Sequence, residues 1–470
     1  MAKQSRSPLT VLVLAAGKGT RMRSDTIKLL HEVAGRPMVA HVLEAARGLK
    51  PRRTITVVGH QADRVEQALT GESDAFVLQK EQRGTGHAVM QAAAELGKAR
   101  RGTVLILNGD LPTLRTATLR RLVNRHQRSG AHMTLMSAVL DDATGYGRIV
   151  RDEKGGFQRI VEHKDADAAE RQIPEINCGI YCARIDKLLP VLEKLRPDNA
   201  QGEYYITDAV HYMLERKGLV EAVCHDDAEE VLGVNNRAEL ARASVTLYGR
   251  HAAALQERGV TLLDASRTWI DPRARVGADT VIYPDVYIEG ASKVGKHCVI
   301  RPGCRISGST VGNGCEIKDH SVVLDSKIGN DAAVGPFAHL RPGTDLGAEV
   351  KIGNFVEIKK TRMGKGAKAS HLSYLGDAEI GSGSNIGAGT ITCNYDGVNK
   401  HRTELGAGVF IGSDTQLVAP VKLGKGAYVG AGSTVTQDVP AGALAVSRTK
   451  QTNIKGWVAR KQKRRDKGSK

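Results

Sequence analysis

The sequence predicts an α/β protein that consists of a mostly parallel sheet, a connecting helix and a parallel β-helix. Three observations carry this prediction. Apolar runs alternate with helical patterns over the first 235 residues, a proline-free, alanine-rich segment follows at 236–256, and an aliphatic residue recurs every six positions beyond residue 261. The 470 residues allow two or three domains, each large enough for its own core.

Alternation of strand and helix patterns defines the first part of the chain. Helical spacing of apolar residues occurs at Met38–Arg47 and Gly86–Leu96. Strands that alternate with such helices indicate βαβ units and a Rossmann-like sheet, whose ligands bind at the carboxyl ends of the strands. The predicted strands are Thr10–Ala15, Thr54–Val58, Thr103–Leu107 and Met133–Val139.

Residues 236–256 contain no proline, one glycine and abundant Ala, Leu and Arg. This composition predicts a helix by propensity and period. We expect it to connect two domains.

A period of six residues is the clearest signal in the second part of the chain. It belongs to neither a helix nor an alternating strand. Hexapeptide repeats resemble the left-handed parallel β-helix, in which each short strand sends one aliphatic side chain inward and a glycine-rich corner turns the chain. Of the 52 glycines, 30 lie in the last 210 residues. The residues in phase are Ile328, Val334, Leu340, Leu346, Ile352 and Ile358, then Ile380 and Ile386, then Ile411, Leu417, Leu423, Val429 and Val435.

The period breaks between Met363 and Ile380 and again between Thr392 and Ile411. Irregular segments of a solenoid form loops on one face, which is often the binding face. We therefore expect loops in both breaks. The predicted organisation is a sheet domain at 1–237, a helical linker at 238–258, the β-helix at 259–454 and a basic tail at 455–470.

Composition limits the classes of protein and partner. No apolar run approaches the roughly 20 residues of a membrane span, and the first ten residues lack the apolar region of a signal peptide. Seven cysteines show neither CxxC pairs nor a disulfide-framework spacing, so we expect a cytoplasmic protein without a membrane segment. The net charge of +17 favours anionic partners, but an aromatic fraction of 4% and the absence of nucleic-acid-binding motifs favour small phosphorylated molecules over nucleic acid.

The first predicted strand runs into the string Leu14-Ala15-Ala16-Gly17-Lys18-Gly19-Thr20-Arg21-Met22. Its glycines let the backbone approach a ligand, and Lys18 and Arg21 add positive charge. The Walker A pattern is absent, and GxG alone is also common in ordinary turns. The whole string, followed by Lys28, resembles the signature of sugar-phosphate nucleotidyltransferases, in which an arginine and a lysine hold the triphosphate.

The resemblance continues at ordered points along the chain. Gln79 with Gln82–Ala88 resembles the family's uracil-reading loop, and Asp110 closes an apolar strand where a carboxylate could hold Mg²⁺. Gly145–Arg148, Val161–Lys164, Ile176–Gly179 and Gly233–Asn236 complete the series. With the hexapeptide half included, nearly the whole chain resembles the family of bifunctional bacterial N-acetylglucosamine-1-phosphate uridyltransferases and glucosamine-1-phosphate N-acetyltransferases.

This resemblance implies a uridyltransferase site. Arg21 and Lys28 would neutralise charge during the reaction, and Asp110 and Asn235 would hold Mg²⁺. The family usually has proline before the lysine, whereas Ile27 precedes Lys28 here, which leaves the rigidity of this loop open. The positions that correspond to contacts with UTP or UDP-N-acetylglucosamine are Leu14, Ala15, Ala16, Gly17, Lys28, Gln79, Gly84, Thr85, Asn108, Gly109, Asp110, Gly147, Glu162, Asn177 and Asn235.

The resemblance also implies an acetyltransferase site in the β-helix. His371 would be the general base, although a lone histidine in a corner is as readily structural. The family builds this site between adjacent β-helices of a trimer, which implies a homotrimer here. The sugar phosphate would contact Arg341, Lys359, Tyr374 and Asn385, and acetyl-CoA would contact Ala388, Asn394, Tyr395, Ser413, Ala431 and Arg448.

The expected function is a bifunctional route to UDP-N-acetylglucosamine. Acetyl-CoA would acetylate glucosamine-1-phosphate, and UTP would then transfer its uridylyl group to N-acetylglucosamine-1-phosphate with release of pyrophosphate. No cysteine has the context of an activated nucleophile, so direct acetyl transfer is favoured.

The sequence is also compatible with two other functions. One is a single-activity sugar-phosphate nucleotidyltransferase with a structural or regulatory β-helix, against which the segments HLSYLGD and TCNYDG argue. The other is a nucleic-acid or membrane-surface binder driven by positive charge. The tail KGWVARKQKRRDKGSK carries eight Lys/Arg and one Asp. It is either a solvated end or a contact for CoA phosphates of a neighbouring chain.

Overall fold

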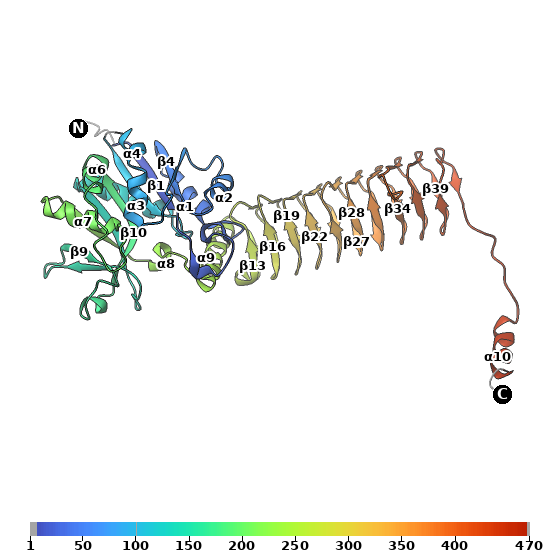
Figure 1. The fold of residues 1–470 in the computed structure, drawn as a ribbon. Coiled ribbons are helices and arrows are strands. Elements are labelled where there is room, and N and C mark those ends of the chain that lie inside the picture. Colours follow the sequence, from blue (N-terminus) through green and yellow to red (C-terminus); the bar gives the residue numbers. More distant parts are fainter. Residues whose placement is uncertain (1–6, 100, 468–470) are drawn as a thin grey trace. The chain divides into compact units, whose positions relative to one another are not determined.

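The computed structural model describes residues 7–99 and 101–467, and the chain divides into two compact units, Met1–Leu247 and Tyr248–Lys470 (Figure 1). The first unit is α/β, and the second is built almost entirely from short parallel strands. Within the described ranges, no helix is long and apolar enough to cross a membrane.

A mixed, mostly parallel sheet forms the centre of the first unit and confirms the predicted α/β class. Its strand order is β11-β7-β10-β6-β1-β4-β5, and β10 runs antiparallel to both of its neighbours. The hairpin β8–β9 attaches to β10, and β2–β3 forms a separate ribbon. The strands are β1 Leu9–Ala15, β2 Glu32–Val33, β3 Arg36–Pro37, β4 Arg53–Val58, β5 Ala75–Leu78, β6 Thr103–Asn108, β7 Met133–Val139, β8 Arg148–Arg151, β9 Phe157–Val161, β10 Glu175–Arg184 and β11 Val220–His225.

Helices cover both faces of this sheet because side chains of a strand point alternately to its two faces. In β1, Val11 and Val13 belong to one buried cluster with α1 and α5, whereas Leu12 belongs to the other with α3, α6 and α7. The helices of this unit are α1 Met38–Arg47, α2 Ala62–Ala68, α3 Thr85–Gln91, α4 Ala93–Gly97, α5 Thr116–Ser129, α6 Ile185–Leu192, α7 Ile206–Glu215 and α8 Ala228–Val231, with 3₁₀ turns η1 Thr20–Met22, η2 Lys28–Leu30 and η3 Glu170–Gln172.

The single helix predicted at Gly86–Leu96 is wrong in one respect, because two helices, α3 and α4, occupy this segment. The Ala92 amide donates to the Val89 carbonyl, three residues back, at 3.1 Å. This contact tightens the chain into a 3₁₀-like turn and ends α3.

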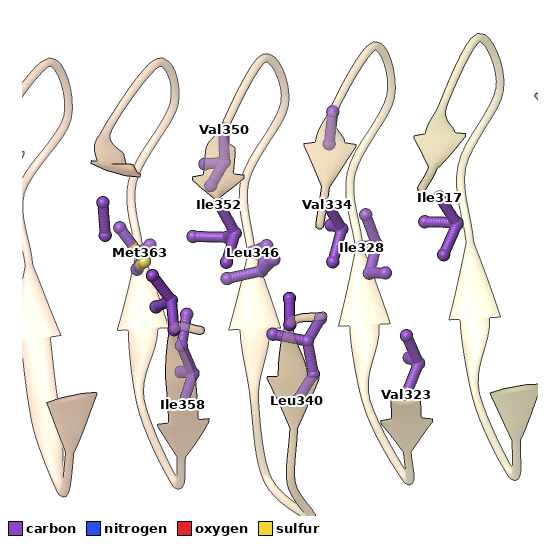
Figure 2. Packing of buried hydrophobic residues seen from close by; sticks show 14 of the residues in the cluster. Ile317, Val323, Ile328, Val334, Leu340, Leu346, Val350, Ile352, Ile358 and Met363 are labelled. Carbon is purple, nitrogen blue, oxygen red and sulfur yellow. The ribbon is translucent and has the colours of Figure 1, made fainter. Parts of the chain in front are cut away.

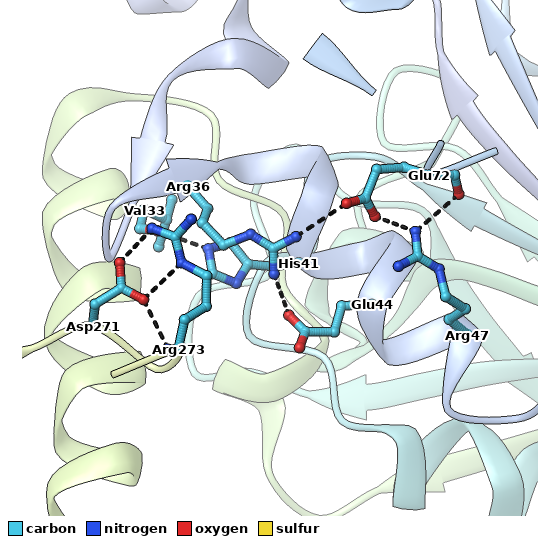
Figure 3. A network of polar contacts seen from close by, with 8 residues as sticks. All are labelled: Val33, Arg36, His41, Glu44, Arg47, Glu72, Asp271 and Arg273. Carbon is cyan, nitrogen blue, oxygen red and sulfur yellow. Dashed lines mark hydrogen bonds and ion pairs between the residues drawn. The ribbon is translucent and has the colours of Figure 1, made fainter. Parts of the chain in front are cut away.

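A polar network fixes α1 against the ribbon that follows Lys28 (Figure 3). His41 on α1 lies with Nε2 2.7 Å from the Val33 carbonyl oxygen of β2. Arg36 pairs with Glu44 of α1, and its second nitrogen lies 3.6 Å from Glu72. The segment that carries Lys28 is thereby connected to a buried helix.

The connecting helix α9 spans Arg237–Gln256 and confirms the helix predicted at 236–256. In its first half, Leu240, Ala243 and Leu247 pack into the core of the first unit. In its second half, Ala252 and Leu255 belong to the core of the β-helix.

The second unit is the predicted β-helix, in which short strands stack in three parallel sheets. Strands recur every third element, and paired residues in most coils are 17 or 18 positions apart. Figure 2 shows the inward aliphatic side chains that fill its centre. All the residues that follow the six-residue period are buried. The hexapeptide prediction is therefore confirmed.

The strands of the three sheets are short. The first sheet contains β12 Thr261–Leu262, β15 Val281–Ile282, β18 Val299–Ile300, β21 Glu316–Ile317, β24 Ala333–Val334, β27 Lys351–Asn354, β30 Lys368–His371, β33 Asn385–Ile386, β36 Phe410–Ile411, β39 Tyr428–Val429 and β41 Leu444–Ala445. The second contains β13 Thr268–Ile270, β16 Val286–Glu289, β19 Arg305–Ser307, β22 Val322–Leu324, β25 His339–Leu340, β28 Glu357–Lys359, β31 Tyr374–Gly376, β34 Ile391–Cys393, β37 Gln416–Val418 and β40 Thr434–Val435. The third contains β14 Arg275–Val276, β17 Lys293–Val294, β20 Thr310–Val311, β23 Lys327–Ile328, β26 Asp345–Leu346, β29 Arg362–Met363, β32 Ala378–Ile380, β35 Thr403–Leu405 and β38 Val421–Leu423. Outside the sheets lie η4 Ala265–Arg267 and α10 Trp457–Lys467.

The loop predicted in the first break of the period is wrong. Ala369 and Leu375 continue the inward row at spacings of six, and both are fully buried. His371 lies at the end of strand β30. The period is hidden because a small alanine fills one inward position and because Ile380 follows Leu375 by five positions instead of six.

The second break is a true insertion. Ile386 pairs with Ile411, which is 25 positions later, whereas the pairings just before and just after it in the same sheet span 17 and 18 positions. The extra residues form a loop between β34 and β35, and within it Tyr395 bridges to Lys400.

Candidate active sites

The first candidate site lies beyond the carboxyl ends of β1 and β6, where α/β sheets bind ligands. Two adjoining cavities of about 420 and 340 Å³ share Arg21, Thr85, Asn108 and Asp110. Ala15 is an exception among the predicted contacts, because it is fully buried and lines neither cavity. The larger cavity also contains Leu14, Ala16, Gly17, Lys28, Gln79, Gly84 and Gly109, and the smaller one contains Gly147, Glu162, Asn177 and Asn235.

The two residues predicted to hold Mg²⁺ lie together, bridged by a lysine. Lys28 Nζ is 2.6 Å from Asp110 Oδ2 and donates to Asn235 Oδ1 at 2.9 Å. Arg21 donates to the same Asn235 oxygen at 2.8 Å. The Asn235 amide nitrogen donates to the Gly233 carbonyl at 3.1 Å, so its oxygen is the atom that faces the cations.

The donor set of this cluster fits magnesium. Asp110 and Asn235 offer a carboxylate and an amide oxygen, the hard ligands that Mg²⁺ prefers. Among the described residues, no group of three or more His, Cys, Asp or Glu side chains could hold a metal ion. Two protein ligands suit an ion that takes its other ligands from water and phosphate oxygens.

The smaller cavity contains a buried acid. Thr207 Oγ1 donates to Glu162 Oε1 at 3.1 Å, and burial raises the pKa of the Glu162 carboxyl. Asn177 Nδ2 donates to the Tyr181 hydroxyl at 2.6 Å. Sequence reasoning missed Thr207 and Tyr181, because neither stands in a local pattern that distinguishes it from a core residue.

The second candidate site lies on the β-helix, in a cavity of about 440 Å³ that includes His371 and Asn385. Coil stacking creates a column in which each member follows an inward core residue by two positions. His371 Nδ1 lies 3.0 Å from Asn354 Oδ1, one coil earlier in the same column. The members of the column that line the cavity are His371, Ala388, Ser413 and Ala431.

A cluster of cations lies on the neighbouring sheet of the β-helix. Lys400 beside Lys359 lowers the pKa of the Lys359 ammonium, and Arg341 lowers it further. Arg341 also pairs with Glu357 at 2.7 Å. Lys400 comes from the inserted loop and was missed by sequence reasoning, since its proximity to Lys359 depends on the fold of that loop.

The other predicted contacts divide between these two faces. Gly376 leaves space that the Tyr374 hydroxyl and the Asn394 amide occupy, and a Cβ there would lie 2.4 Å from the hydroxyl. Tyr395 is exposed in the inserted loop. Arg448 donates to the Ala431 carbonyl at 2.6 Å, beside the column. The structure thus places Asn385 with His371, whereas Arg341, Lys359 and Tyr374 lie on the neighbouring sheet.

An aromatic wall completes the cavity on the β-helix. The rings of Phe410 and Tyr428 stack with centroids 4.4 Å apart, and both side chains are exposed. They belong to successive strands of one sheet, because Phe410 pairs with Tyr428 in register. The coil repeat of 18 positions could have identified this pair from the sequence.

Family models match both units of the chain. Residues 11–169 match the MobA-like NTP transferase domain. In the β-helix, residues 265–363 match the GMPPB C-terminal domain, and residues 402–437 match the bacterial transferase hexapeptide (six repeats).

Relatives match nearly the whole chain. The bifunctional protein GlmU of Pelobacter propionicus is 51% identical over 97% of this chain and 99% of its own length. That of Heliobacterium modesticaldum is 51% identical over 97% of this chain and 98% of its own length, and that of Geotalea uraniireducens is 50% identical over 97% and 99%. With this coverage of both units, the chain belongs to the family of bifunctional GlmU proteins.

Proposed function

We propose that the chain is a bifunctional enzyme of UDP-N-acetylglucosamine synthesis, with a uridyltransferase site in the first unit and an acetyltransferase site on the β-helix. One observation carries the proposal. Two chemically different clusters lie in two different units, namely Lys28, Asp110 and Asn235 in one, and His371 with its column in the other.

The first reaction transfers a uridylyl group from UTP to N-acetylglucosamine-1-phosphate. The sugar phosphate attacks the α-phosphorus in line, and pyrophosphate leaves. Arg21 and Lys28 bind the anionic oxygens. Asp110 and Asn235 would hold Mg²⁺, which would supply further positive charge next to the phosphates. No covalent intermediate with the protein is required, so positioning and electrostatics supply the rate.

The sugar moiety is assigned to the smaller cavity. Glu162 and Asn177 line it with Gly147, whose missing side chain leaves the Glu162 carboxylate accessible from the backbone side. A Cβ on Gly147 would lie 3.3 Å from Glu162 Oε2. Neutral polar groups of a sugar suit a buried carboxyl that Thr207 already orients.

The second reaction transfers an acetyl group from acetyl-CoA to the amine of glucosamine-1-phosphate. His371 donates from Nδ1–H to Asn354 Oδ1, which leaves Nε2 as the base that takes a proton from the attacking amine. The amine attacks the thioester carbonyl, and the CoA thiolate leaves. Arg341, Lys359 and Lys400 suit the sugar phosphate, whereas the narrow column of Ala388, Ser413 and Ala431 suits the extended CoA chain.

The division of the acetyltransferase residues between two sheets supports a homotrimer, in which a neighbouring β-helix completes each site. Exposed apolar side chains support it as well, because Phe337 and Phe355 stack at 5.4 Å on successive coils next to exposed Leu372. Sedimentation equilibrium of the full chain should give three times 50.4 kDa. A cytoplasmic location is consistent with seven unpaired cysteines, all of which lie in the described part of the chain.

Two assays on one preparation test the proposed function. Pyrophosphate release is measured with UTP, N-acetylglucosamine-1-phosphate and Mg²⁺, and free CoA thiol is measured with acetyl-CoA and glucosamine-1-phosphate. We expect His371→Ala to abolish thiol release and to leave pyrophosphate release unchanged. Absence of thiol release in the parent protein would favour a single-activity nucleotidyltransferase, and loss of both activities in a folded His371→Ala trimer would refute two separate sites.

A further inference from the structure

Gln79 is a buried amide whose orientation is fixed by two neighbours. It lines the larger cavity of the first unit and is only 3% exposed. Its Nε2 lies 3.2 Å from the Gly84 carbonyl oxygen and 3.0 Å from His87 Nδ1. A carbonyl oxygen only accepts hydrogen bonds, so the atom of the amide that faces Gly84 is its nitrogen.

The Gly84 carbonyl is itself held in place. Gly84 has a φ of +104°, and a Cβ there would lie 2.5 Å from the Tyr204 carbonyl oxygen. The residues on either side of Gly84 are hydrogen-bonded to the backbone of Tyr204. The Gly86 amide donates to the Tyr204 carbonyl at 2.8 Å, and the Tyr204 amide donates to the Arg83 carbonyl at 2.9 Å. The acceptor that orients Gln79 therefore cannot move away without breaking this loop.

His87 has to present an acceptor to the same nitrogen. Its Nδ1 accepts from Gln79 only when the ring is neutral and carries its proton on Nε2. Gln91 Nε2 lies 3.0 Å from His87 Nε2, and two N–H groups cannot hydrogen-bond to each other. A half-turn of the Gln91 amide places its oxygen there, where it accepts the proton. Gln91 and His87 thus form a chain of hydrogen bonds that ends at Gln79.

The consequence concerns the one atom of Gln79 that these contacts leave for a ligand. No hydrogen bond to Gln79 Oε1 occurs in residues 7–99 and 101–467, and the amide lines the cavity. We infer that His87 and Gly84 lock the Gln79 oxygen toward the nucleobase, so that His87 is a positioning residue that selects uracil over cytosine. The inference rests on the proposed function, in which this cavity holds UTP.

The chemistry of the two bases explains the selection. Uracil carries N–H at N3, which donates to an amide oxygen, whereas N3 of cytosine is an acceptor and would face that oxygen lone pair to lone pair. A glutamine free to turn would present its oxygen to one base and its nitrogen to the other. Only a locked amide distinguishes them.

The test compares UTP and CTP on the full chain, with kcat/KM from pyrophosphate release and Kd from calorimetry for each nucleotide. His87→Leu removes the acceptor. We expect the ratio of kcat/KM for UTP to kcat/KM for CTP to fall about tenfold, which corresponds to the usual contribution of one hydrogen bond to a buried group. His87→Asn retains an acceptor near the Nδ1 position and should restore the ratio to within about threefold of the parent. His211→Leu replaces an exposed histidine on α7 and serves as the matched control.

The outcomes separate the inference from the proposed function. Suppose that the parent turns over UTP and that His87→Leu lowers kcat/KM by the same factor for UTP and for CTP. His87 then has only a structural role, and the inference is wrong. A parent that prefers CTP would also overturn it. If the parent binds UTP without turnover, the proposed activity fails, while the ratio of Kd values still decides the role of His87. Hydrogen exchange of peptides from β6 in each variant verifies that the first unit is folded.

Discussion

The ammonium group of Lys28 lies 2.6 Å from the carboxylate of Asp110, and both side chains are largely buried. The residue that resemblance assigns to the triphosphate thus contacts the residue assigned to Mg²⁺. Nucleotide and metal would therefore have to rearrange this pair when they bind, so the two groups act as one unit.

Replacing Asp110 tests this relationship. Asp110→Asn keeps the size of the side chain but removes the charge that pairs with Lys28 and that would hold the metal. We expect pyrophosphate release to fall at least about 100-fold and thiol release to remain unchanged. Activity of the variant that returns at higher Mg²⁺ concentration would identify the loss as one of metal affinity, whereas unchanged pyrophosphate release would contradict the assignment.

Asn354 should govern the histidine base through its contact at Nδ1. Asn354→Leu leaves this nitrogen without a partner, so we expect kcat of acetyl transfer to fall about 10- to 100-fold with little change in KM. In Asn354→Asp the added charge favours the protonated ring, and the acid limb of the pH–rate profile should move to higher pH. A profile that stays in place would show that the contact has no effect on the base.

Lys400 should contribute to binding of the sugar phosphate. Its position beside Lys359 concentrates positive charge, as the lowered pKa of Lys359 indicates. Lys400→Met should raise KM for glucosamine-1-phosphate about tenfold with a smaller effect on KM for acetyl-CoA. Lys365→Met, which removes an exposed lysine paired with Glu349, should change neither constant. Equal effects of the two substitutions would indicate a general influence of charge.

Tyr428 should support the CoA chain by its stacked ring. Tyr428→Ala removes half of the aromatic wall, and we expect KM for acetyl-CoA to rise up to about tenfold. Tyr287→Ala removes a similarly exposed tyrosine that stacks on Trp269 and is the matched control. The assignment fails if initial-rate measurements give the same KM for both variants.

His126 should make the first unit sensitive to acid. Burial lowers the pKa of His126 from 6.5 to about 4, and its Nδ1 lies 3.0 Å from the Thr134 hydroxyl. As the pH falls below 6.5, His126 binds a proton in the unfolded chain, whereas in the folded chain it stays neutral down to about pH 4. The contribution of neutral His126 to the free energy of unfolding is therefore fully present above pH 6.5 and decreases as the pH falls.

At pH 5 this loss amounts to about 2 kcal/mol. His126→Gln stays neutral at every pH, so the difference in unfolding free energy between pH 7 and pH 5 should shrink by about this amount. Hydrogen exchange of peptides from β6 measures the first unit by itself. The same pH dependence in parent and variant would exclude His126 as its source.

Periodicity is what made the fold accessible from the sequence. The strand Met133–Val139 and the helix Met38–Arg47 are confirmed at their predicted bounds, because each repeats its apolar side chains with its own period. The same signal failed at Ala369, since an alanine at an inward position does not stand out from its polar neighbours. Periodicity also failed at Ala92, whose amide donates to the Val89 carbonyl three residues earlier and so divides the predicted helix into two.

Only those residues of the candidate sites that lie in local sequence motifs could be predicted from the sequence. Gln79, Asp110 and His371 stand in short strings with recognisable composition, whereas Asn354, Thr207 and Lys400 do not. Their roles depend on neighbours 17 or more positions away, which coil stacking and sheet pairing bring into contact. Counting coils would have found Asn354, because it precedes His371 by one coil.

In the coil that closes only after 25 residues, the inserted loop that carries Lys400 is separate from the stacked strands that stabilise the β-helix. Asn385 and Ile386 pair with Phe410 and Ile411, so the strands on either side of the insertion stack in register. This pairing does not depend on the residues between Cys393 and Thr403. Since each coil of a solenoid contacts only its neighbours, a change in the length or sequence of this loop is confined to the loop. Selection could therefore alter Lys400 and its surroundings at little cost to the scaffold, and an engineer could replace the loop for the same reason.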